Sequence, residues 1–291
     1  MTVKDQLFSG TFEQSKKIVS KSILTEEGAA IGLMSSMTLR KKCLIPFLDI
    51  IFLGLIFAVG VALPVFILND TSSILSESTR ELIYFIGQFT SPITQILIII
   101  HFVLVMLNLF PKPNYAYQLL YGNIIVLLLL VVLASFSFVP FSLGLTIAAF
   151  GWIGFLPQLL LCLYLWKVCV MDKCQQLRTA IYQESTIALD WGSKLVSFIK
   201  SYGGILLGLS ILNRWTLNLG ELVKDPPGLL SFLYGWIFLL FMFLMLFALG
   251  QALKNTIIAY YFFRYQKEYR KHFNISDEQW YGKWRSKILS K

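Results

Sequence analysis

Residues 203–221, GGILLGLSILNRWTLNLGE, decide how the rest of the chain is arranged. This stretch is the least hydrophobic of the segments that could cross a bilayer, and it carries an arginine, Arg214, deep inside it. If it crosses the membrane, the C-terminal tail lies on the same side as the N-terminus. If it does not cross, the tail lies on the opposite side, so the whole topology depends on this segment.

Composition indicates a membrane protein. Of the 291 residues, 56% are hydrophobic and 14% are charged, and the mean hydropathy is +0.68. Soluble domains carry about 25% charged residues, so this chain has too few charged side chains to cover a water-facing surface. Several apolar runs of about 18 residues or more predict transmembrane helices.

We expect an all-α polytopic membrane protein, a bundle of six transmembrane helices with an amphipathic cytoplasmic helix between spans four and five. The expected segments follow in chain order: a basic, amphipathic cytoplasmic N-terminal segment (1–43), transmembrane helices 1–4 (44–170), the amphipathic cytoplasmic helix (171–202), transmembrane helices 5–6 (203–263) and a basic, aromatic cytoplasmic tail (264–291).

The distribution of basic residues supports this layout. The segments assigned to the cytosol hold 22 of the 25 lysines and arginines, whereas the outer loops hold only Arg80 and Lys224. Cytoplasmic loops carry such an excess of basic residues, so we place both termini in the cytoplasm and the protein in the plasma (cytoplasmic) membrane. Contact with the lipid bilayer and its anionic headgroups then accounts for the net charge of +9, and no nucleic-acid partner is expected.

Two connections between spans have distinct patterns. Spans three and four are separated by Pro140 without any charge, which predicts a tight hairpin. Residues 172–202 have helical amphipathic periodicity, which indicates a helix that lies in the cytoplasmic interface or docks on a soluble partner. The residues expected to bind a partner on this helix are Leu177, Ile181, Glu184, Trp191 and Leu195.

A few polar residues within the spans are the candidate substrate-binding residues. Arg214 shares one helix face with Ser210 and Asn218, and it either binds a phosphate or carboxylate of a substrate or only anchors its helix. Asp49 is about 8 Å from the cytosolic end of its span and Arg214 about 16 Å, which argues against a direct pair. His101 is either a member of a proton relay or a hydrogen-bonded packing residue.

The sequence carries no catalytic signature, metal-ligand spacing or cofactor motif, so we expect no enzyme, no cofactor and no metal site. The first hypothesis is a transporter or permease component that lacks its own ATPase and depends on a separate nucleotide-binding subunit or on an ion gradient. In size and layout the chain resembles the membrane subunits of ABC-type exporters, without any shared motif. The alternative is a membrane scaffold, regulatory or immunity-type protein that acts by binding another membrane protein.

Overall fold

A computed structural model describes residues 7–24, 39–70, 75–110, 112–133, 138–182, 208, 234–282 and 286–288. Every regular element in these residues is a helix, as the sequence predicts. Five helices within the described residues are long and apolar enough to cross a membrane, which is compatible with an integral membrane protein. The predicted fifth span, residues 203–220, lies outside the described residues apart from residue 208.

The first two spans form an antiparallel pair. The first consists of α4 (Leu39–Phe57), the π-helix η3 (Ala58–Ala62) and α5 (Leu63–Asn69), and the second is α6 (Glu77–Asn108). Ser76 caps α6 by accepting a hydrogen bond from the backbone N–H of Thr79. Gly87 lies so close to Pro64 that an added Cβ would come within 2.7 Å of that ring, so this glycine allows the two spans to pack tightly.

The third crossing differs from the prediction. Helix α7 (Tyr115–Val132) and the part of α8 (Val139–Trp166) before Gly151 run in the same direction along α6, because Ile125 packs with Val105, and Gly144 lies against Ile83. The predicted hairpin at Pro140 is therefore wrong. Pro140 occupies the first turn of α8, where a proline is compatible with helix initiation.

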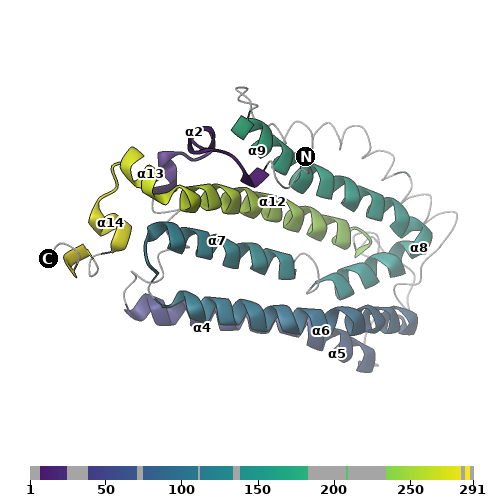
Figure 1. Cartoon of the computed structure of the whole chain (residues 1–291). Helices are drawn as coiled ribbons and strands as arrows, with labels where there is room; N and C mark the ends of the chain where they lie inside the picture. The colour runs from purple at the N-terminus through teal and green to yellow at the C-terminus, as the bar shows by residue number, and fades with distance from the viewer. Residues whose placement is uncertain are drawn as a thin grey trace.

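The chain instead reverses within α8, at Gly151. This residue has φ 66° and ψ 173°, a conformation that is essentially restricted to glycine. The part of α8 after Gly151 returns beside α12 (Ile237–Arg264) (Figure 1). It continues without a break through the π-helix η5 (Lys167–Met171) into α9 (Asp172–Tyr182).

Helices α9 and α12 run parallel to each other. Near one end of the bundle the side chain of Gln158 donates a hydrogen bond to the carbonyl of Gly235. Near the other end, a Cβ on Gly10 would lie 2.9 Å from both Ile181 and Tyr261, so these two residues are neighbours. The part of residues 172–202 that the structure describes thus continues from α8 and packs inward. The separate amphipathic helix is not confirmed.

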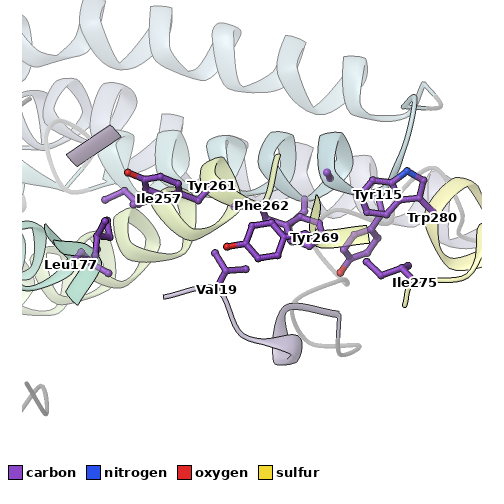
Figure 2. Packing of buried hydrophobic residues seen from close by; sticks show 13 residues of the cluster. Val19, Tyr115, Leu177, Ile257, Tyr261, Phe262, Tyr269, Ile275 and Trp280 are labelled. Atoms are coloured by element: carbon purple, nitrogen blue, oxygen red, sulfur yellow. The ribbon is translucent and has the colours of Figure 1, made fainter. Parts of the chain in front are cut away.

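The two chain ends pack together at one end of the bundle and form a cap. It combines α2 (Phe12–Ser15) and the 3-10 helix η1 (Lys21–Leu24) with α13 (Gln266–His272) and α14 (Asp277–Tyr281) (Figure 1). Val19 lies near Tyr269 and Phe262 in the largest buried cluster, as Figure 2 shows. The described part of the predicted N-terminal segment, residues 7–24, therefore forms short helices folded onto the C-terminal helices.

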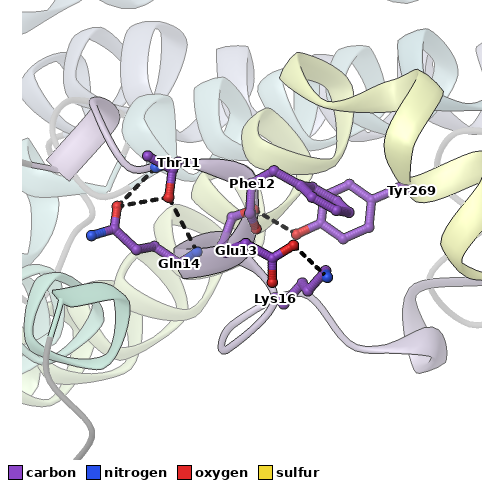
Figure 3. A network of polar contacts seen from close by, with 7 residues as sticks. Thr11, Phe12, Glu13, Gln14, Lys16 and Tyr269 are labelled. Carbon is purple, nitrogen blue, oxygen red and sulfur yellow. Dashed lines mark hydrogen bonds and ion pairs between the residues drawn. The ribbon is translucent and has the colours of Figure 1, made fainter.

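Hydrogen bonds hold the N-terminal part of this cap. Thr11 and Gln14 form a capping box at the start of α2, and Glu13 pairs with Lys16 (Figure 3). The hydroxyl of Tyr269 lies 2.6 Å from Oγ of Ser15, and both side chains are fully buried. The basic, aromatic tail is thus partly a folded element.

Candidate functional site

A buried carboxylate–imidazole pair joins the first two spans. Nε2 of His101 on α6 lies 3.1 Å from Oδ1 of Asp49 on α4. The side chain of His101 is 1% exposed and that of Asp49 is 14% exposed. Both residues belong to candidate membrane spans, so two polar groups meet where the surroundings are apolar.

The helix pattern explains why Asp49 faces inward. Most neighbours of Asp49 on α4 are apolar and exposed on the outer face of the bundle: Phe47, Leu48, Ile50, Ile51 and Phe52. Leu53, one helical turn after Asp49, is buried in a cluster with Val132. Asp49 therefore lies toward the buried side of α4, where the antiparallel α6 brings His101 opposite to it.

Each partner also has a polar atom without a hydrogen-bond partner among the described residues. These atoms are Oδ2 of Asp49 and Nδ1 of His101, and both are buried. A buried polar group that lacks a hydrogen bond is costly. Binding of a polar ligand at the two remaining atoms would lower this cost.

The pair can hold its protons in more than one arrangement. When the aspartate is ionised and the imidazole is neutral, Nε2–H donates to the carboxylate oxygen and the pair carries one negative charge. One added proton makes the pair neutral, either as an aspartic acid that donates to Nε2 or as an imidazolium beside a carboxylate. Histidine and aspartate side chains within spans form such proton relays in pumps and transporters.

The other candidate substrate-binding residues are not placed. Arg214, Ser210 and Asn218 lie outside the described residues, so their role as a substrate contact stays a prediction. The sequence singled out both Asp49 and His101 but did not pair them with each other. The sequence positions alone could have predicted this contact. Asp49 and His101 each lie 26 residues from Leu75, in the connection between the two antiparallel spans, and are therefore opposite each other.

Of the five predicted partner-binding residues, the structure describes two. Leu177 is 5% exposed and Ile181 is fully buried, and both belong to the core beneath the cap. These two side chains contact the protein's own helices and do not form an open docking face. Glu184, Trp191 and Leu195 lie outside the described residues, so partner binding there remains a prediction.

Two other polar side chains within the described helices bond to backbone carbonyls. The amide of Gln158 binds the carbonyl of Gly235 on the neighbouring chain segment at 2.7 Å, and Asn123 donates to the carbonyl of Leu119. In the part of the chain that the structure describes, no group of three or more His, Cys, Asp or Glu residues is arranged to hold a metal ion. Asp49–His101 is therefore the candidate site with titratable chemistry.

Comparison with known proteins gives no further assignment. The chain matches no family model, no curated protein and no solved structure. Its function therefore has to be inferred from the geometry of the bundle and of the Asp49–His101 pair.

Proposed function

We propose that this protein is a transporter or permease component that has no ATPase of its own and uses the Asp49–His101 pair to couple transport to a proton gradient. The observation that carries the proposal is the 3.1 Å contact between two titratable side chains inside adjacent candidate spans. An ionisable residue at the centre of a span costs about 2.5–3.5 kcal/mol on insertion scales. Apolar residues would pack the same helices without that cost, which favours a functional role.

The exposure of the two residues suits a proton that enters and leaves. His101 is closed off from its surroundings, whereas Asp49 retains 14% exposure at the surface of α4. A small shift of α4 against α6 would change the exposure of the carboxylate and with it the affinity for the proton. Protonation and the packing of the first two spans are linked in this way.

We also propose a six-span topology with both ends of the chain in the cytoplasm. Tyr182 and Tyr234 lie near opposite ends of α12, because α9 and α12 run parallel. These two described positions thus lie at opposite ends of the bundle, which supports the proposed crossing by residues 203–220. The cap carries basic residues of α12 and α13, and the positive-inside rule places it in the cytoplasm: Arg264, Lys267, Arg270 and Lys271.

Reconstituted protein tests the coupling. Proteoliposomes that contain a pH-sensitive dye would be exposed to a panel of amino acids, sugars, organic acids and phosphate. We expect one class of solute to change the internal pH in a wild-type preparation. The change should be lost in Asp49→Asn and His101→Gln and kept in Gln95→Ala, which alters an exposed polar residue of the same helix α6.

Arg214 is the proposed contact for the anionic group of a substrate, together with Ser210 and Asn218. Replacing Arg214 with leucine should then abolish solute uptake while the protein still inserts into the membrane. If uptake by Arg214→Leu equals that of the wild type, this residue has no part in the substrate site. Solute uptake without any change of the internal pH would contradict proton coupling but would still support a transporter.

Affinity purification in mild detergent distinguishes transport driven by an ATPase partner from transport driven by a proton gradient. A stoichiometric nucleotide-binding subunit with ATPase activity in the eluate would replace proton coupling by an ATP-driven partner. Capture of another membrane protein, with no solute uptake in any assay, would favour the scaffold or regulatory alternative.

A further inference from the structure

The N-terminal segment, residues 7–24, contacts the ends of α9 and α12 at the same point. This point is Gly10, which is buried. A Cβ added to Gly10 would lie 2.9 Å from Cγ2 of Ile181 on α9 and 2.9 Å from the hydroxyl of Tyr261 on α12. The segment therefore packs against both helices where they reach the cap (Figure 1).

Hydrogen bonds join the same part of the segment to both helices. On the side of α9, Oγ of Ser9 lies 3.0 Å from the hydroxyl of Tyr182, the last residue of that helix. On the side of α12, the backbone N–H of Gly10 donates to the hydroxyl of Tyr261 at 3.1 Å. The hydroxyl of Tyr265, which follows α12 directly, donates to the carbonyl of Gly10 at 2.6 Å. Two adjacent residues of the segment thus link the end of α9 to the end of α12.

The other end of α9 is held by a direct backbone contact. The π-helix η5 immediately precedes α9, and such bulges in α-helices are frequent at functional sites. The carbonyl of Cys169 in η5 packs so closely onto Gly250 of α12 that a Cβ there would overlap it. Because α9 has 11 residues, its last residue lies about 15 Å along the helix axis from its first. Helix α9 is thus an arm with a close backbone contact at one end and the N-terminal segment at the other.

We propose that the N-terminal segment is a latch that fixes the end of α9 against α12, and that its release lets α9 swing outward about η5. Movements of this kind are absorbed by a few residues at the end of a helix. Release removes the contact of Gly10 with Ile181 and the hydrogen bond to Tyr182 together. It would uncover Ile181, which is fully buried while the segment is docked and which the sequence assigns to partner binding. The latch is a property of the fold and does not require that the protein transports a solute.

Distances between two spin labels, measured by pulsed electron paramagnetic resonance on the purified full chain, test the latch. The four cysteines are first replaced by alanine. The labels are then attached at Thr179→Cys on α9 and at Asn255→Cys on α12. A reference pair, Ile124→Cys on α7 with Asn255→Cys, reports two helices that are in direct contact, because the hydroxyl of Thr256 donates to the carbonyl of Asn123 at 3.5 Å.

Two substitutions weaken the latch to different extents. In Gly10→Val the added side chain overlaps both helices, so a second, longer distance between Thr179 and Asn255 should gain population by about tenfold or more over the same label pair without the substitution. Tyr265→Phe removes only one hydrogen bond, and the expected gain is about fivefold. Lys21→Gln is the matched control, because Lys21 is an exposed residue of the same segment, and it should leave the distance unchanged.

Hydrogen exchange of the Val19 amide, which donates to the carbonyl of Ser15 at 3.0 Å, shows independently whether the segment is docked. Faster exchange in Gly10→Val together with an unchanged distance between Thr179 and Asn255 would mean that the segment leaves without moving α9, and it would overturn the proposal. Exchange as slow as in the wild type would show that docking does not depend on Gly10, which overturns it as well. An equal change in the reference pair would indicate a general loosening of the bundle and would also contradict a latch.

Discussion

The hydrogen bond between Tyr269 and Ser15 makes a specific prediction about the cap. Oγ of Ser15 donates to the carbonyl of Phe12 at 2.8 Å, so the hydroxyl of Tyr269 has to donate to Oγ of Ser15 at 2.6 Å. The direction of this bond decides which of two substitutions costs more.

In Tyr269→Phe the donor is removed and Ser15 keeps its bond to the backbone. We therefore expect a loss of only about 1 kcal/mol in the docking of the N-terminal segment. In Ser15→Ala the acceptor is removed and the buried Tyr269 hydroxyl has no partner, which costs about 2 kcal/mol. The double variant should resemble Tyr269→Phe, because no polar group is then left unpaired.

Hydrogen exchange measures both changes. The backbone N–H of Val19 donates to the carbonyl of Ser15 at 3.0 Å and is protected while the segment is docked. The opened population, and with it the exchange rate, should rise about 5-fold in Tyr269→Phe and about 30-fold in Ser15→Ala at 25 °C. Tyr182→Phe is the control, since its hydrogen bond to Ser9 is exposed. Faster exchange in Tyr269→Phe than in Ser15→Ala would refute the assigned direction of the bond.

Three further predictions concern single residues. Burial raises the pKa of Tyr269 to about 12, so docking of the cap should weaken by about 1.4 kcal/mol per pH unit as the pH rises from 10 to 12. The part of the tyrosinate absorbance that Tyr269→Phe removes should titrate near pH 12. A titration midpoint near pH 10 would contradict this prediction. Gly250→Val should lower the thermal unfolding midpoint strongly because of overlap with the Cys169 carbonyl, whereas Gly54→Val, with nothing within 4 Å of the added Cβ, should change it little. Gln158→Leu leaves the carbonyl of Gly235 without its hydrogen bond and should cost about 1–3 kcal/mol in the same assay, and a midpoint equal to that of the wild type would show that this bond contributes nothing.

The apolar runs predicted the helices well, but not the places where the chain turns. A proline in an apolar run is compatible with a reversal and with a helix start, and Pro140 starts a helix. The reversal at Gly151 depends on a positive φ, which the sequence does not distinguish from the ordinary helical φ of another glycine. Tertiary packing decides between these conformations.

The sequence predicted Asp49 and His101 as separate candidate residues but did not predict the contact between them. Depth estimates for Asp49 used its distance from the end of its own span, whereas contact depends on the register of two antiparallel helices. The amphipathic pattern that includes Leu177 and Ile181 correctly predicted a buried helix face. It did not identify the surface that covers this face. An apolar stripe has the same periodicity whether it contacts a partner, lipid or the protein's own N-terminal segment.

The cap also constrains how the protein is made. The hydroxyl of Tyr261 receives a hydrogen bond from the backbone N–H of Gly10 and donates one to the carbonyl of Leu7, across 251 and 254 residues of sequence. At translation rates of about 5–20 residues per second, the N-terminal segment is synthesised on the order of 10–50 s before Tyr261. During this interval its apolar side chains lack the surface of the C-terminal helices that buries them in the folded protein. Closure of the cap therefore has to wait until the C-terminal helices have been synthesised.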